Sequence, residues 1–212
     1  MWSALTCQWR ALFAQQARWH LWLGSALGLG LFWGVIGISL EAALRLHPLL
    51  VTSLCLIFGF RLSVLGGALA LALCTWLSFL TLSGLPAGLA SIVANPLWQN
   101  YSYNLLLGVI IPAGLTFGIL RIITLRKIQN LFIYTLGVSF AGGMVTMILT
   151  GASGWLLAYA FDELHLPLLH SNSHLFILLA FPEGFCNGAL ISTLAVLAPQ
   201  LVKTYDHDFY LS

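Results

Sequence analysis

Long stretches of this chain contain almost no charged residue, and this feature constrains the fold more than any other. Of all residues, 60% are hydrophobic and 7% are charged, whereas about 25% of the residues of a soluble domain are charged. About 20 apolar helical residues cross a bilayer core, and backbone polar groups there must be satisfied within the protein. The sequence therefore predicts an all-α, polytopic membrane helix bundle.

The apolar stretches predict about six transmembrane helices. We expect them at about residues 21–40, 46–60, 63–80, 103–125, 131–149 and 175–202. Before the first, Trp2, Leu5 and Trp9 recur at helical spacing, which predicts an interfacial helix. The chain is thus expected to be one membrane domain, 1–212, with a cytoplasmic or interfacial segment at 1–19, the bundle at 20–203 and a cytoplasmic tail at 204–212.

The lysines and arginines predict the orientation of the bundle. With a cytoplasmic N-terminus, seven of the eight basic residues fall on or near the cytoplasmic side, and only Arg45 lies outside. Such an excess of positive charge is typical of cytoplasmic loops. We therefore expect a multi-pass protein of the bacterial inner membrane with both termini in the cytoplasm.

Glu183 is the only acidic residue deep inside a membrane-length apolar segment. A charge at such a depth costs about 2.5 to 3.5 kcal/mol on insertion scales, so we expect the residue to have an interaction partner or a functional role. Pro182 precedes it and is expected to kink or break the helix, and Asn187 follows one turn later on the same face. The pair is predicted to bind substrate; the alternative is a packing role, and a glutamine at position 183 is expected to preserve the fold.

Histidines collect on the predicted outer face. The candidate metal ligands are His47, His165, His170 and His174, accompanied by Glu41, Asp162 and Glu163. Imidazole suits nickel, cobalt, copper and zinc. The pattern predicts a surface that captures a divalent transition-metal cation; the alternative is a polar loop with interfacial histidines.

A short motif suggests a different chemistry. Gly151-Ala152-Ser153-Gly154 matches the GxSG of rhomboid intramembrane proteases, in which the serine needs a neighbouring base. His174 is the candidate base, but it begins its span and the rhomboid pattern Ala-His-x-x-Gly is absent. We therefore expect these glycines to mark a helix end or kink and expect no enzymatic activity. Gly184 and Gly188, four residues apart, predict close helix contact.

The C-terminal third carries a family resemblance. The segments Pro182-Glu183-x-Phe185-x-Asn187-Gly188 and Pro199-x-x-Val202-x-Thr204-Tyr205-Asp206 resemble the end of bacterial energy-coupling-factor ABC transporter permeases, distant relatives of cobalt/nickel transport permeases. Weaker similarity covers residues 46–211. The resemblance implies a substrate-capturing component, driven by an ATPase and a coupling membrane subunit. Because this chain has no Walker-type phosphate-binding loop, both must be other chains.

The N-terminus departs from the cobalt/nickel group. Those permeases begin Met-His-Ile-Pro-Glu-Gly and bind metal through the terminal amine and the histidine, whereas this chain begins Met1-Trp2-Ser3-Ala4. That site is not carried over, and we expect a site built from His47, His170, His174 and Glu183 instead.

The predicted function is the substrate-binding permease of an energy-coupling-factor-type importer for nickel, cobalt, zinc or copper. No other cofactor and no nucleic acid is expected, and membrane lipid is the third partner beside the two subunits. The alternative is a non-transporting integral subunit or assembly factor of a larger membrane complex.

Overall fold

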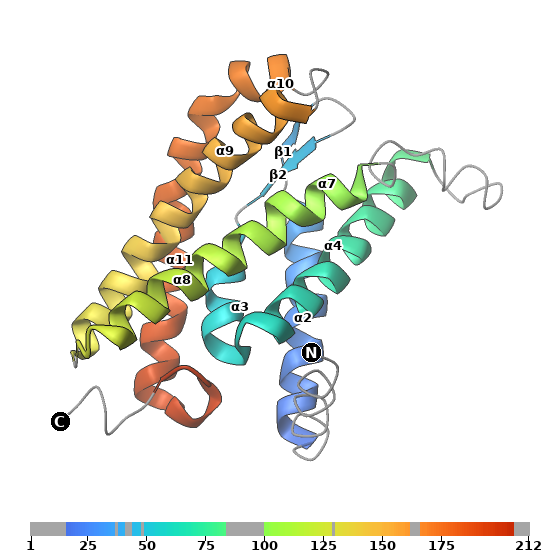
Figure 1. Cartoon of the computed structure of the whole chain (residues 1–212). Coiled ribbons are helices and arrows are strands. Elements are labelled where there is room, and N and C mark those ends of the chain that lie inside the picture. Colours follow the sequence, from blue (N-terminus) through green and yellow to red (C-terminus); the bar gives the residue numbers. More distant parts are fainter. Residues whose placement is uncertain are drawn as a thin grey trace.

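The computed structural model describes residues 16–36, 38–40, 44–47, 49–83, 100–128, 130–161 and 166–205. In these ranges the chain forms a helix bundle with one short β-hairpin (Figure 1). Five helical segments are long and apolar enough to cross a membrane. The predicted class, a polytopic membrane helix bundle, is confirmed. The predicted interfacial helix and the tail after Tyr205 lie outside the described residues.

Most of the predicted spans correspond to observed helices. The first is α2 (Gln16–Ile36), which packs along α4 (Phe60–Ser83). A continuous helical segment follows from α7 (Tyr101–Leu105) through η1 (Leu106–Ile110) to α8 (Ile111–Leu125). The remaining elements are η2 (Ile133–Ala141), α9 (Gly142–Phe161), α10 (Leu166–Ser171), α11 (Ser173–Leu197) and η3 (Pro199–Leu201). Strands β1 (Ile38–Leu40) and β2 (Leu44–Leu46) pair antiparallel, with Ser39 opposite Arg45.

The predicted second span, residues 46–60, is not a membrane-length helix. After β2, residues 47, 49 and 50 have no regular secondary structure, and the chain then forms only the eight-residue helix α3 (Val51–Phe58). At 1.5 Å per residue, α3 is about 12 Å long, less than half of a bilayer core of about 30 Å. Gly59 ends it with a φ of 84°, a conformation that glycine adopts without steric cost. In place of the predicted second span, the structure therefore has irregular backbone followed by a half-helix, α3.

Two predicted helix breaks are also absent, whereas the alternative of a kink at either place stays a prediction. α11 runs continuously through Pro182, and Gly151-Ala152-Ser153-Gly154 lies inside α9 instead of at its end. Gly151 allows close packing, because a Cβ there would lie 2.5 Å from Cγ of Phe176. In the described ranges 130–161 and 166–205, no hydrogen bond joins Ser153 to His174, so the geometry gives the protease motif no support.

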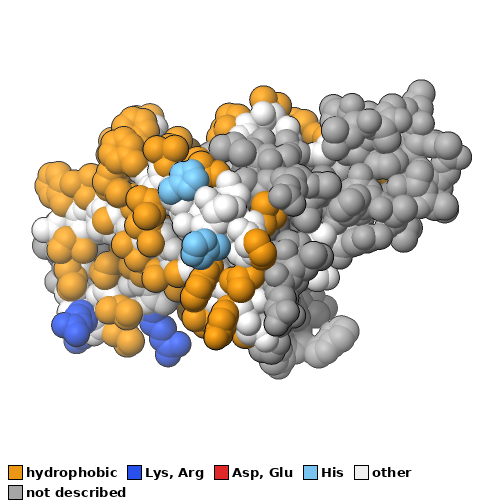
Figure 2. All heavy atoms as spheres, turned by 90° about the horizontal axis from the view of Figure 1, so that it is seen from above, with side chains coloured by type: hydrophobic (Ala, Val, Ile, Leu, Met, Phe, Trp, Pro, Cys, Tyr) orange, Lys and Arg blue, Asp and Glu red, His pale blue; other side chains and the backbone are white. Residues whose placement is uncertain are grey.

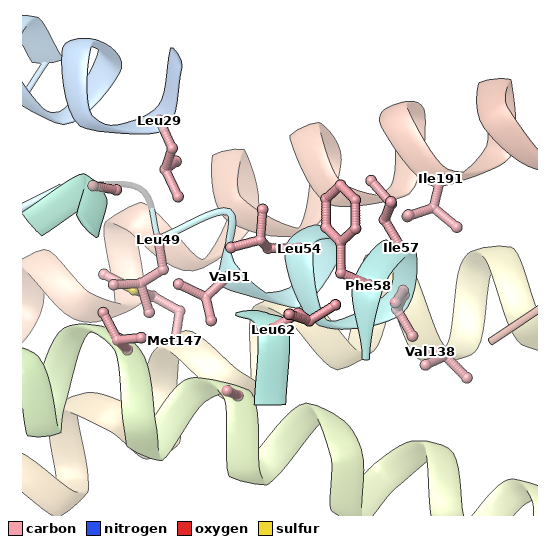
Figure 3. Close-up of a cluster of buried hydrophobic side chains, with 14 of the residues drawn as sticks. Leu29, Leu49, Val51, Leu54, Ile57, Phe58, Leu62, Val138, Met147 and Ile191 are labelled. Atoms are coloured by element: carbon pink, nitrogen blue, oxygen red, sulfur yellow. The ribbon is translucent and has the colours of Figure 1, made fainter. Parts of the chain in front are cut away.

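Helix α3 lies at the centre of the bundle, and all eight of its residues are buried. Figure 3 shows Leu54, Ile57 and Phe58 of α3 among side chains from the surrounding helices: Leu29, Leu62, Val138 and Ile191. Since lipid is as apolar as these side chains, the packing is stabilised by close van der Waals contact and by hydrogen bonds between helices. The hydrogen bonds at the two ends of α3 therefore determine where this helix lies in the bundle.

All described basic residues except Arg45 gather at one end of the bundle. Arg45 lies in the hairpin, whereas the others lie in the first turns of α2 and α4, toward the end of α8 and after η3: Arg18, Arg61, Arg121, Arg126, Lys127 and Lys203. In Figure 1 these element ends lie opposite the hairpin and α10. The arrangement agrees with the predicted charge asymmetry; the compartment that each end faces stays a prediction.

Candidate functional site

Glu183 of α11 lies at the start of α3. Its Oε2 accepts the N–H of Leu49 at 2.6 Å, and its Oε1 accepts the N–H of Leu50 at 2.8 Å. Leu50 has a left-handed φ of 49°, which costs an ordinary residue about 1–2 kcal/mol. Here two consecutive N–H groups point at one anion, as in backbone nests. The carboxylate also lies at the positive end of the α3 dipole, so Glu183 caps α3 from another helix.

Asn187 extends this cap by one turn. Its Nδ2 donates to Oε1 and to the backbone carbonyl of Glu183, each at 2.7 Å. Its Oδ1 accepts from the N–H of Ser53 at 2.8 Å and from Ser53 Oγ at 2.6 Å. Both side chains are fully buried, and Asn187 uses both of its donors and both lone pairs of its oxygen. The predicted neighbours Glu183 and Asn187 do meet, and what they contact is the backbone of α3.

The other end of α3 is held by the segment that follows α11. The N–H of Lys203 donates to the carbonyl of Ile57 at 3.0 Å, and the N–H of Thr204 donates to that of Leu56 at 3.2 Å. Thr204 Oγ1 also donates to Leu56 O at 2.8 Å and lies 2.8 Å from the hydroxyl of Tyr134. These contacts satisfy carbonyls that a helix end leaves without a partner in the helix. α11 and its tail therefore hold α3 at both ends.

A small, partly open cavity lies beside the start of α3. We call it the His47 cavity; its volume is about 50 Å³, and its polar wall consists of His47, Cys74, Thr75, Ser78, Asn104 and Thr150. His47 is 4% exposed and stacks on Trp33, with ring centroids 4.1 Å apart. Leu49 belongs to both the cavity wall and the Glu183 cap. The cap therefore fixes one wall of the cavity.

Three of the four histidines predicted to bind metal are described, and they differ in burial. His47 is buried within the bundle, and the side of the membrane on which it lies stays a prediction. His170 and His174 are exposed, and Figure 2, which views this end of the bundle, shows histidines among hydrophobic side chains. His165, Glu41, Asp162 and Glu163 lie outside the described residues. Within the described part, no three His, Cys, Asp or Glu residues form a metal-binding group, and the surface site stays a prediction.

A second, larger hollow lies between α2, α3 and α11. Its volume is about 300 Å³, and its only polar side chains are Ser25 and Ser53. The Ser53 hydroxyl already donates to Asn187. Specific binding sites combine apolar walls with several convergent polar groups, which this hollow lacks. Acyl chains suit it better than a polar substrate.

Sequence reasoning identified Glu183, Asn187 and His47 but missed the residues that complete their surroundings. Ser53 and Thr204 hydrogen-bond across the bundle, and Cys74 and Thr150 complete the cavity. The only local sequence signal for these residues was the Glu-x-x-x-Asn pair in an apolar segment, because its side-chain oxygens need hydrogen-bond donors. Comparison with models of known families, with characterised proteins and with solved structures finds no match to this chain.

Proposed function

We propose that this chain is the substrate-capturing permease of an energy-coupling-factor-type importer and that its substrate is a divalent transition-metal cation. The observation that carries the proposal is the short helix α3, where irregular backbone at His47 leads into eight helical residues beside a cavity that His47 lines. Interrupted helices at substrate sites are typical of membrane transporters. The chain's membrane-embedded bundle supplies the setting that such a site requires.

The size of the His47 cavity favours an ion over an organic solute. Pockets for small organic molecules usually measure about 300–1,000 Å³, whereas this cavity measures about 50 Å³. A cavity holds a water molecule once it offers about 10–15 Å³ to a water-sized sphere, so this cavity has room for a cation with water ligands.

The charge at the start of α3 favours a cation over an anion. The N-terminus of a half-helix ordinarily attracts an anionic ligand. Here the Glu183 carboxylate already occupies that position. An anionic substrate would meet this carboxylate, whereas a cation near His47 is shielded from the positive end of the helix.

The proposal gives the two groups of residues different roles. The imidazole of His47 binds the cation, while Glu183 and Asn187 are positioning residues that act on the substrate through α3. The exposed His170 and His174 gather cations at the surface above. Because α11 holds both ends of α3, a partner ATPase that moves α11 also moves the cavity wall at Leu49 and so opens the site.

Metal titration of the purified protein tests this proposal. We expect saturable binding of nickel, cobalt, zinc or copper near neutral pH, abolished by His47→Ala. The matched control is His20→Ala, an exposed histidine early in α2, which should bind normally. Binding that survives His47→Ala but disappears in the His170→Ala/His174→Ala double variant would move the site to the surface. No saturable binding of any of the four metals would contradict the proposal.

The predicted partners are tested by co-purification. A tagged chain extracted in mild detergent should bring with it an ATPase and a second membrane subunit. Recovery of a different membrane complex without an ATPase would instead support the alternative of a non-transporting subunit.

A further inference from the structure

The His47 cavity contains a second side chain with metal-binding chemistry. Cys74 of α4 lines the cavity, is 2% exposed and forms no disulfide. The other described cysteines lie elsewhere: Cys55 donates to the carbonyl of Ala113 in the core, and Cys186 is half-buried on α11. Among the described residues, Cys74 alone brings a thiol into the same cavity as an imidazole.

Thr150 gives independent evidence that this cavity holds a polar ligand. Thr150 lines the cavity from α9 and is 3% exposed, and its Oγ1 has no hydrogen-bond partner within the described part of the chain. An unsatisfied buried hydroxyl costs about 1–3 kcal/mol. A bound metal ion, or a water molecule on that ion, would supply the missing partner.

We propose that Cys74 is a ligand in the His47 cavity and restricts the substrate to cations that bind sulfur well, such as zinc. Thiolate and imidazole together suit zinc, whereas magnesium, calcium and manganese prefer oxygen ligands. His47 and Cys74 would supply two of the four positions of a tetrahedral site, and Thr150 and water would supply the other two. This inference rests on the proposed function and adds the class of metal to it.

Binding changes the protonation of Cys74 but not the oxidation state of the metal. The S–H bond breaks, its proton passes to water, and a bond forms between the thiolate sulfur and the metal. One proton is therefore released for each ion bound. Because a proton is released, we expect binding to weaken as the pH falls.

Cobalt(II) is the probe for this ligand, because a cobalt–thiolate bond gives a charge-transfer absorption in the near ultraviolet that nitrogen and oxygen ligands do not give. We expect the purified protein to develop this band, which saturates at one cobalt per chain. Cys74→Ser should abolish the band and weaken binding by at least about tenfold, since even residues behind the metal ligands contribute about 10–100-fold. Cys55→Ser and Cys186→Ser are the matched controls and should keep the band.

The outcomes separate this inference from the proposed function. Saturable cobalt binding without the band overturns the role of Cys74 and leaves the metal-binding permease standing. Absence of saturable binding overturns both. Because Cys74→Ser could fail to fold, a reciprocal variant keeps Cys74 and replaces Cys7, Cys55 and Cys186 by serine. If the wild type shows the cobalt–thiolate band and this variant does not, the inference is also overturned.

Discussion

At the scale of single residues, Glu183 supplies α3 with an anion that the sequence of α3 lacks. Every side-chain contact of its carboxylate is with a donor: the N–H groups of Leu49 and Leu50 and the Nδ2 of Asn187. A buried charge is tolerated in a membrane when it is fully hydrogen-bonded within the protein. This arrangement also changes the expectation that a glutamine would be harmless, because an amide has one acceptor oxygen and one donor nitrogen, whereas a carboxylate has two acceptor oxygens.

We predict that Glu183→Gln destabilises the protein by about 1–3 kcal/mol, the cost of leaving a buried donor unsatisfied. The amide nitrogen would face one of the donors that the carboxylate now accepts. Thermal unfolding in detergent measures the effect. Ser63→Ala is the control, because Ser63 is equally buried but its Oγ donates to the carbonyl of Phe60 in its own turn and contacts neither Leu49 nor Leu50 in the described hydrogen bonds.

An unchanged midpoint for Glu183→Gln would contradict the capping role. Glu183 would then be available for the direct contact with substrate that the sequence predicted.

At the scale of elements, α11 and the segment after it hold α3 in place. Glu183 and Asn187 hold the start of α3, and the segment after α11 holds its end. α11 itself is fixed against η2 through Gly184, where a Cβ would lie 2.6 Å from the carbonyl oxygen of Phe140. The position of the half-helix therefore depends on the close contact between α11 and η2.

Gly184→Ala should destabilise the protein by about 1–3 kcal/mol, the usual cost of overpacking. Gly24→Ala is the matched control in α2, because a Cβ there meets no atom within 4 Å, and the exchange should be neutral or gain up to about 1 kcal/mol from helix propensity. Unfolding midpoints of the two variants provide the comparison. Equal midpoints would show that α11 and η2 do not need their close approach.

The sequence predicted the long helices but not the half-helix α3. The lengths of the apolar runs located the helices at residues 16–36, 60–83, 101–125, 133–161 and 173–197. Each of these helices satisfies its own backbone hydrogen-bonding groups and needs no distant partner. The same criterion failed at residues 46–60. There the backbone donors are satisfied by Glu183, 134 residues further along the chain from Leu49, and no local pattern contains that partner. The His47 cavity was missed for the same reason, since its wall comes from several separate elements.

At the scale of the whole molecule, the two ends of the bundle differ in chemistry. The hairpin and α10 lie at one end, where the exposed His170 belongs to α10 and the exposed His174 to the first turn of α11. The opposite end carries all described basic residues except Arg45. The half-helix α3 and the His47 cavity lie between the two ends, where a permease would hold its substrate during transfer. The charge asymmetry predicts that the histidine end faces outward.

The central claim is that a metal ion binds in the His47 cavity while Glu183 stays engaged with α3. The most direct measurement is a crystal structure of the full chain grown with cobalt(II) and recorded at the cobalt absorption edge. We predict an anomalous peak between His47 and Cys74, with the Glu183 carboxylate still accepting the N–H groups of Leu49 and Leu50. A peak found only beside His170 and His174, or a cavity without one, would contradict the account.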